Sequence, residues 1–318
     1  MNPRMLAVSQ RSYGGPEVLE VVETGRPEPG PGEVLVRVRA AGVNPADRRI
    51  RSGEIRRFGE PPFTLGLDLS GVVERVGAGV RRFRPGDAVF GNAFPPRGAY
   101  AEYAVTAEDR LAALPPHLDH VHAAALPTAG LTAWQPLTRV APVAAGQRVL
   151  VHAAAGAVGH LAVQIAKARG AYVIGTARAA GHGLLRDLGA DEAVDYTDTD
   201  FAEAVKDVDV VLDPIAGDYG PRSLRTLAPG GVLIDVRGSG PDRTAVRREA
   251  EARGLRFAEF GFTPSGADLA ELAALAGDGR LRVAVGEVLP LARAAEAHEL
   301  SASGRAEGKI VLSVSDRR

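Results

Sequence analysis

The stretch HAAAGAVGHLAVQ at residues 152–164 limits the fold more than any other part of the sequence. It follows the apolar run RVLVH and leads into HLAVQIAKA, whose apolar residues recur three and four positions apart, as in a helix. Between strand and helix, Ala153, Gly156 and Gly159 give the spacing A-x-x-G-x-x-G, a variant of the dinucleotide-binding fingerprint. Small residues there permit a tight turn, close approach of backbone N–H groups to a pyrophosphate, and packing of the helix on the strand. The alternative is a packing turn that binds no ligand.

The region from 148 to about 260 repeats this alternation of strand and helix. Apolar runs of strand length, such as AYVIGTAR and VDVVLDPI, are separated by stretches with helical spacing, such as GLLRDLGA. Such alternation predicts a parallel sheet that is covered on both faces, the doubly wound arrangement of a Rossmann domain.

The flanking regions have β character. Residues 1–110 contain short β-branched runs divided by turn signals such as EPGPGE and RPGD. Helices are expected over 119–140, with Asp119 as the N-cap, and over 266–279, after which the tail returns to strand character.

The expected chain is therefore α/β with two domains. A β-rich domain at 1–122 is interrupted by a dinucleotide-binding Rossmann domain at 123–265 and completed by 266–318.

The end of the second strand of this Rossmann domain separates NAD from NADP enzymes. NAD-binding domains place a carboxylate about 20 residues beyond the glycine turn, where it binds the ribose 2′-hydroxyl. This chain reads Gly175-Thr176-Ala177-Arg178 there, and no acidic residue follows until Asp187. Arg178 is suited to pair with a 2′-phosphate, which a carboxylate would repel. The sequence therefore favours NADPH, and the alternative is that Arg178 is a solvated surface residue.

The composition excludes several kinds of chemistry. The chain has no cysteine, which excludes disulfides, thiolate catalysis, iron–sulfur clusters and cysteine-ligated zinc. Its formal net charge of −1 creates no field that attracts nucleic acid or an anionic membrane. The start MNPRMLAVSQRSYGG lacks the apolar core of a signal peptide, and histidines and glycines interrupt the apolar run at 149–166. We expect a cytoplasmic protein with no nucleic-acid or membrane partner.

Longer motifs resemble one family. GQRVLVHAAAGAVGHLAVQIAK is similar to the quinone oxidoreductase pattern, with Ala157 in place of a usual second glycine. GVNPADRRIRSG and GLDLSGVVERVGAGVRRFRPGDAVFG resemble the catalytic domain of the medium-chain dehydrogenase/reductase superfamily, and RGAYAEYAV, LPTAGLTAW and GKIVLSV also fit. The resemblance covers nearly the whole chain. It implies a GroES-like catalytic domain, a Rossmann domain, a cofactor in the cleft between them, and homodimers.

The resemblance points to the zinc-independent branch of this superfamily. Zinc-containing relatives carry a cysteine ligand near the position of Asn44, and this chain has none. It also lacks room for a structural zinc lobe, because AEYAV runs directly on to LAALPPHLD. No metal site is therefore expected.

The resemblance also implies contacts to the cofactor. Asn44 would lie beside the nicotinamide, Thr132 would hold its carboxamide, and Tyr196 would lie near the adenosine phosphate. With strand ends at the cofactor edge and Lys309 on the phosphate side, the expected binding set is Asn44, Thr132, Ala155, Gly156, Ala157, Val158, Gly159, Thr176, Arg178, His182, Tyr196, Pro214, Ile215, Val236 and Lys309. The alternative for each is ordinary packing or surface exposure.

Two departures from the family pattern bear on chemistry. Many relatives have a tyrosine five residues after Asn44, where this chain has Arg49. Asn44 and Arg49 are therefore the catalytic candidates, as donors to the substrate oxygen. Relatives also often carry a lysine after the second strand for the 2′-phosphate; here the loop is AAGHG, so His182 or Arg178 must substitute.

Two polar clusters each allow a structural and a functional interpretation. In PHLDHVH, which contains His117 and Asp119, His120 and His122 would point to different helix faces, so a capped helix start is favoured over a metal site. The run RRIRSGEIRR at 48–57 is typical of a solvated face. The alternatives are a contact for an anionic substrate handle, such as a coenzyme A phosphate, and RNA binding, which the neutral total charge disfavours.

These observations predict an NADPH-dependent, zinc-independent reductase that transfers hydride to a quinone or to the β-carbon of an enone. One alternative is an enoyl-thioester reductase acting on coenzyme A or carrier-protein substrates. An alternative of another class is a non-catalytic NADPH-binding protein that acts as a redox sensor or structural partner.

Overall fold

The structure is a computed structural model that describes residues 3–237, 242–304 and 308–315. Its contacts divide the chain into two compact units. The first is formed by Met1–Leu131, Pro264–Gly277 and Val283–Arg318, and the second by Thr132–Thr263 and Asp278–Arg282. Relative to the expected boundaries, residues 123–131 pack with the first unit and residues 278–282 with the second.

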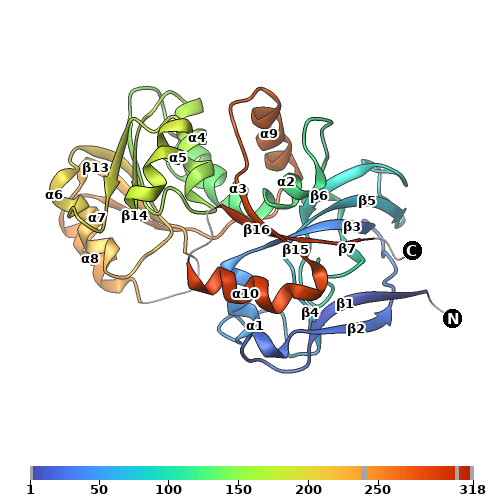
Figure 1. Ribbon diagram of the computed structural model, residues 1–318. Helices are drawn as coiled ribbons and strands as arrows, with labels where there is room; N and C mark the ends of the chain where they lie inside the picture. Colours follow the sequence, from blue (N-terminus) through green and yellow to red (C-terminus); the bar gives the residue numbers. More distant parts are fainter. Residues whose placement is uncertain (1–2, 238–241, 305–307, 316–318) are drawn as a thin grey trace. The chain divides into compact units, whose positions relative to one another are not determined.

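Two sheets form the first unit (Figure 1). The larger one has the order β15 (Val285–Pro290), β16 (Lys309–Ser313), β3 (Glu33–Val43), β5 (Asp68–Val76), β6 (Ala88–Asn92) and β8 (Leu111–Ala113), and β7 (Tyr103–Ala107) also pairs with β3. Its pairings are antiparallel except that of β15 with β16. The smaller sheet has the order β2 (Glu20–Gly25), β1 (Arg4–Gln10) and β4 (Phe63–Thr64).

Short helices accompany these sheets. They are α1 (Pro45–Arg51), α2 (His120–Ala124), α9 (Gly266–Gly277) and α10 (Ala294–Ser303), with 3-10 turns η1 (Pro16–Val18), η2 (Glu108–Arg110) and η5 (Leu291–Arg293). The central strand β3 is buried on both faces, because Val34, Leu35 and Val36 are all 0% exposed. Its apolar segments VLV and AAGV suit a strand that is buried on both faces.

The strand register brings distant polar residues to one end of the larger sheet. Asp68 on β5 lies opposite Gly42 on β3 and opposite Asn92 on β6. On the other side of β3, Ile310 of β16 lies opposite Val43, so Lys309 reaches the residues that lead from β3 into α1. The fold thus gathers charged groups where most of the surroundings are apolar.

The second unit is a single parallel sheet with helices packed on it (Figure 1). Its strand order is β11 (Glu192–Asp195), β10 (Tyr172–Ala177), β9 (Arg148–Val151), β12 (Val208–Asp213), β13 (Leu227–Asp235) and β14 (Arg256–Glu259). The connecting helices are α4 (Gly159–Ala168), α5 (His182–Asp187), α6 (Phe201–Ala204), α7 (Tyr219–Leu224) and α8 (Thr244–Ala252), and the 3-10 turn η4 (Ala179–Gly181) precedes α5. The expected α/β class is confirmed, and the strand order reverses between β9 and β12, where doubly wound sheets bind ligands.

The prediction of one continuous helix over 119–140 is wrong, because the structure has separate helices there. Asp119 does cap α2, with its Oδ1 accepting a hydrogen bond from His122 N at 2.8 Å. The chain then breaks before α3 (Pro127–Gln135), which a π-helical turn, η3 (Pro136–Val140), follows. Pro127 explains the break, because proline lacks an N–H group and disfavours helical geometry at the residue before it.

Within the described part of the chain, no helix has both the length and the hydrophobicity needed to cross a bilayer.

Candidate functional site

The glycine turn of the second unit joins β9 to α4 in a strained, tightly packed form. Ala153 has a positive φ of 47°, and Gly156 N donates to Ala153 O at 2.8 Å. A Cβ at Gly159 would lie 2.3 Å from Ala153 O, so only glycine lets α4 begin against the turn. At the start of α4, His160 N donates to Gly156 O and Ala162 N donates to Val158 O, both at 3.0 Å, and the positive end of the helix dipole at this terminus favours an anion. Ala155, Ala157 and Val158 lie half-buried in the same turn.

A buried histidine next to the glycine turn supports it. His152 Nε2 lies 2.9 Å from Ser223 Oγ, and its Nδ1 lies 3.2 Å from Thr176 Oγ1. Burial, together with the charge of Arg222, lowers the pKa of His152 to about 3. Ala153 N donates to the same threonine hydroxyl at 3.3 Å. The Thr176 side chain is fully buried and supports the turn through these contacts, and its expected contact with the cofactor stays a prediction.

Acid should act on the second unit through His152. Between pH 6.5 and about 3 the unfolded state binds a proton at this histidine and the folded state does not, so its contribution to stability is lost as pH falls. Between pH 6.5 and pH 5 the wild type should lose about 2 kcal/mol relative to His152→Gln, at 1.36 kcal/mol per pH unit. Urea unfolding followed by the fluorescence of Trp134, the single tryptophan, measures this difference.

The control variant for this measurement is His122→Gln, which changes a histidine outside the buried cluster and should keep the wild-type pH dependence. If the free energy of unfolding changed with pH in the same way for the wild type and His152→Gln, the assignment of a neutral His152 in the folded state would be contradicted.

The ends of β10 and β11 bring together several expected phosphate contacts. Arg178 is exposed, and its Nε donates to Tyr196 OH at 3.1 Å. His182 Nε2 is buried and makes no hydrogen bond among the described residues. Asp195 is not among the residues that the sequence predicts, yet it lies opposite Ala177 across the two strands.

Asp195 shapes this corner through its backbone contacts. Its Oδ2 accepts from Ala179 N at 2.8 Å, and its Oδ1 accepts from Thr197 N and Oγ1 at 2.9 and 2.7 Å. Hydrogen bonds from Thr197, together with that from Ala179, lower the pKa of Asp195. Only the register of β11 against β10 reveals it, because Asp195 stands 17 residues after Arg178 in the sequence.

A second carboxylate organises the ends of β12 and β13. Asp213 Oδ1 accepts from Ile215 N at 2.7 Å and from Ala216 N at 3.0 Å, which fixes the bend after Pro214. Burial raises the pKa of Asp213 to about 6. Val236 N donates to Asp213 O at 2.9 Å, so the three expected contacts Pro214, Ile215 and Val236 lie together.

Thr132 is buried, at 8% exposure, on α3 at the start of the second unit.

In the first unit, Asn44 stands at the centre of a buried charged network. Asn44 Nδ2 donates to Asp68 Oδ2 at 2.9 Å, and Asn44 N donates to Asp47 Oδ2 at 2.9 Å. Lys309 Nζ donates to Asn44 Oδ1 at 2.6 Å and to Val43 O at 3.1 Å. Lys309 is 1% exposed and its ammonium group contacts Asn44, and the expected phosphate-side contact of Lys309 stays a prediction.

Two carboxylates in this network differ in their surroundings. Asp68 also accepts from Asn92 Nδ2 and from Thr128 N, both at 3.0 Å, and from the Thr128 hydroxyl. Asp47 has fewer donors, and burial followed by repulsion from Asp68 raises the pKa of Asp47 to about 7. Burial also lowers the pKa of Lys309, which the charges of Asp68 and Asp47 oppose. Neither carboxylate is among the residues predicted from the sequence, although both stand in motifs quoted for the family.

The arginines of the 48–57 run contact the protein itself. Arg49 Nε donates to Glu54 Oε1 at 2.8 Å, and Arg51 Nε donates to Gly14 O at 3.1 Å. The guanidinium of Arg56 lies over the ring of Tyr13 at 4.8 Å. These contacts give each of the three a structural partner.

The PHLDHVH histidines do not assemble a metal site. His122 Nδ1 lies 2.8 Å from Asp119 Oδ1, whereas His120 Nδ1 lies 2.8 Å from Ser70 Oγ. Among the described residues, no group of three or more histidine, aspartate or glutamate side chains is placed to hold a metal ion.

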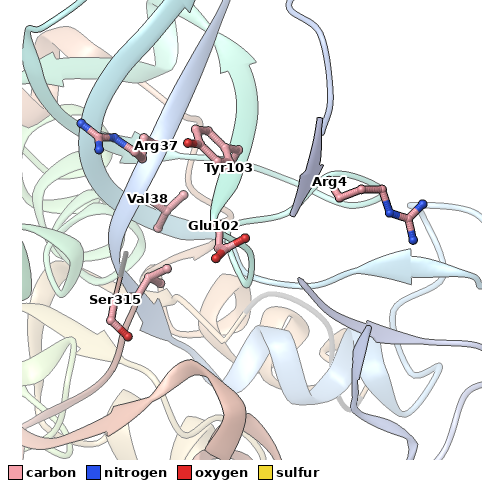
Figure 2. Close-up of a pocket in the computed structure, with 7 residues that line it drawn as sticks. Arg4, Arg37, Val38, Glu102, Tyr103 and Ser315 are labelled. Carbon is pink, nitrogen blue, oxygen red and sulfur yellow. The ribbon is translucent and has the colours of Figure 1, made fainter. Parts of the chain in front are cut away.

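A cavity of about 380 Å³ in the first unit lies apart from the Asn44 network. It is lined by Arg4, Arg37, Val38, Glu102, Tyr103, Val314 and Ser315. Figure 2 shows the Arg4 and Arg37 guanidinium groups pointing away from each other. Glu102 Oε2 accepts from Leu6 N at 2.6 Å, so its charge is used within the sheet. The charged groups that line this cavity therefore do not converge on one point, as those around Asn44 do.

Comparison with known proteins gives consistent matches over the chain. The family model described as alcohol dehydrogenase GroES-like domain matches residues 30–116, and the one described as zinc-binding dehydrogenase matches residues 188–312. Quinone oxidoreductase from Sus scrofa is 35% identical over 97% of both chains. That from Pseudomonas aeruginosa is 38% identical over 95% of this chain and 97% of its own. The solved quinone oxidoreductase from Coxiella burnetii superposes with a TM-score of 0.92 at 35% identity, covering 98% and 100% of the two chains.

Proposed function

Because the chain is an oxidoreductase of the medium-chain dehydrogenase/reductase superfamily, in its quinone oxidoreductase-like branch, we propose that it is an NADPH-dependent, zinc-independent reductase. The proposed reaction transfers hydride to a quinone or to the β-carbon of an α,β-unsaturated carbonyl. The observation that carries the proposal is the tight turn at Gly159, where a Cβ would lie 2.3 Å from Ala153 O, so that glycine alone lets α4 begin close to the turn, as in dinucleotide-binding folds that bring a helix N-terminus to a pyrophosphate. The buried His182 Nε2, which has no partner among the described residues, supports a ligand at the neighbouring strand ends.

In this proposal the nicotinamide supplies the hydride, and the protein binds, orients and shields the reactants. The turn from Ala155 to Gly159 and the start of α4 hold the pyrophosphate. Arg178 and Tyr196 lie at the 2′-phosphate and adenosine side, while Thr132, Pro214, Ile215 and Val236 line the nicotinamide side. These assignments combine the positions of the residues within each unit with the contacts that the family resemblance implies.

The substrate oxygen gains negative charge when hydride arrives and needs a hydrogen-bond donor. We propose that the Asn44 amide is this donor, because Pro45 cannot supply a backbone N–H group. Arg49 is a second proposed donor, because a guanidinium is always charged and stabilises a developing anion. A guanidinium does not readily release a proton, so water completes the reaction. The kcat of Arg49→Ala tests whether Arg49 shares the role.

A steady-state assay tests the proposed function. Purified protein should consume NADPH with members of a panel of quinones and enones, and elemental analysis of the active protein should find no stoichiometric zinc. Turnover with enoyl thioesters alone would favour the enoyl-thioester alternative, and NADPH binding without any turnover would favour the sensor. Loss of activity on chelation with recovery on zinc addition would refute zinc independence. The cytoplasmic location and the homodimer stay predictions.

Preference for NADPH should depend on Arg178. Removing one charge-assisted contact to the 2′-phosphate in Arg178→Ala should weaken NADPH binding by about 1.5–3 kcal/mol. NADH has no such phosphate, so its dissociation constant should barely change. Fluorescence titration of both cofactors measures the difference, with Arg186→Ala on α5 as the matched arginine control. Equal weakening of both cofactors would show that Arg178 does not contact the 2′-phosphate.

A further inference from the structure

The Asn44 amide is held between one group that only donates hydrogen bonds and one that only accepts them. The Lys309 ammonium faces Oδ1 at 2.6 Å, and the Asp68 carboxylate faces Nδ2 at 2.9 Å. We propose that Lys309 is a positioning residue that selects the orientation of the Asn44 amide and thereby presents its N–H group to the substrate oxygen. This inference rests on the proposed function of Asn44.

The reversed amide would meet two repulsive contacts. An asparagine amide fits the same space when turned by 180°, so its partners decide which end is oxygen. In the reversed form the NH₂ group would face the ammonium of Lys309, and the carbonyl oxygen would face the carboxylate of Asp68. Both partners are almost completely buried, at 1% and 0% exposure, so water does not screen these contacts.

The surroundings keep both charges in place. Asp68 accepts hydrogen bonds from Thr128 N, the Thr128 hydroxyl and Asn92 Nδ2 as well as from Asn44, so its oxygens face donors. Lys309 Nζ is anchored by Val43 O, and it lies 3.6 Å from Asp68 Oδ2. The pairing of β16 with β3 fixes the position of Lys309 along this end of the sheet.

The selected orientation leaves the amide able to act on a substrate. Nδ2 carries two hydrogens, of which one is directed to Asp68 and one remains for another acceptor. An ammonium on Oδ1 polarises the amide and strengthens donation from Nδ2, as in a cooperative hydrogen-bond chain. Lys309 therefore acts on kcat through Asn44, and it contributes nothing directly to cofactor binding.

Lys309→Met should lower kcat by about 10- to 100-fold, the range seen when residues that orient metal ligands are removed. The dissociation constant of NADPH should stay within about twofold of the wild type. In an Asn44→Ala background, Lys309→Met should cause no further loss, because the two residues act as one unit. The matched control is Lys206→Met, whose lysine side chain is 50% exposed. An equal loss from Lys309→Met in both backgrounds would overturn the proposal.

The double variant Lys309→Met/Asp68→Asn guards against a folding failure of the single one. It removes both charges of the Lys309–Asp68 pair together and leaves Asp47, whose raised pKa favours a neutral carboxyl. Its kcat should stay low, because a neutral carboxamide at position 68 offers both a donor and an acceptor and selects neither orientation. Recovery of wild-type kcat in this variant would show that the charges serve stability alone.

An NMR measurement separates this inference from the proposed function. The sequence contains three asparagines, Asn2, Asn44 and Asn92, so selective ¹⁵N-asparagine labelling gives three side-chain amide signals, which Asn44→Ala assigns. Lys309→Met should shift the Asn44 amide signals, and Lys206→Met should leave them in place. An unmoved Asn44 signal in Lys309→Met would refute the positioning role, whether or not the protein proves to be a reductase.

Discussion

Replacing Lys309 with methionine should lower the free energy of unfolding of the first unit by about 3–5 kcal/mol, the usual effect of removing one partner from a buried ion pair. Asp68 is 0% exposed, and without the ammonium its charge stays buried among neutral donors. For a unit of this size the loss corresponds to about 6–20 °C in Tm, which scanning calorimetry measures. The double variant Lys309→Met/Asp68→Asn should recover most of the stability, because neither charge remains.

Acid should partly rescue the single variant. Burial already raises the pKa of Asp68 in the wild type, and Lys309 is the first of the groups that oppose this rise. Once Lys309 is removed, the folded state takes up a proton at Asp68 at a higher pH than the unfolded state does. The stability of Lys309→Met should therefore increase as pH falls towards the ordinary aspartate pKa. A Tm deficit that is equal at all pH values, or no deficit at all, would contradict a charged Lys309–Asp68 pair.

The sequence predicts the second unit well because its signals are local. Several of its strands and helices are marked by a change of apolar period within a few residues, as in RVLVHAAAGAVGHLAVQIAKA. The parallel sheet follows from the repeated alternation, and the family resemblance is confirmed by the quinone oxidoreductases that match nearly the whole chain. The small residues at Gly156 and Gly159 are informative for the same reason, since the turn they form is closed by neighbours in sequence.

The charged network of the first unit is invisible to the same approach. Asn44 and Lys309 are 265 residues apart, and only the pairing of β16 with β3 brings them together. A lysine or an aspartate in a sequence is by default an exposed residue, so nothing local marks Lys309, Asp47 and Asp68 as buried. Asp195 shows the same limitation in the second unit, because its place beside Ala177 depends on strand register. Local patterns therefore identify the elements, and non-local pairing decides which polar groups meet.

The same contrast applies to Thr176 and Lys309, two residues of the expected cofactor-binding set. In the structure both side chains are buried, and each acts on a residue beside it: Thr176 on His152 and Ala153, and Lys309 on Asn44. Sequence position locates such residues near a site, but the partners that the fold provides determine what their side chains do.

The largest loss of cofactor binding should come from adding a side chain at the glycine turn. In Gly159→Ala the new Cβ would lie 2.3 Å from Ala153 O and 2.6 Å from Ala154 Cα, and both neighbours are backbone atoms that cannot rotate away. The helix must move off the turn, which should destabilise the second unit by about 1–3 kcal/mol, the usual range for overpacking. The displaced N–H groups should also weaken NADPH binding, because the pyrophosphate contacts of such a turn depend on the position of the helix N-terminus.

Two further glycines turn this expectation into a graded test. A Cβ at Gly156 would lie 3.1 Å from Ala153 O, whereas one at Gly183 on α5 would meet no atom within 4 Å. Titration of NADPH should therefore give a large loss for Gly159→Ala, an intermediate loss for Gly156→Ala and none for Gly183→Ala, which should also gain slight helix stability. The order follows from distances to the backbone alone, since each substitution adds the same methyl group. If Gly159→Ala bound NADPH as tightly as Gly183→Ala, the turn would be a packing device, and the cofactor would have to bind elsewhere in the chain.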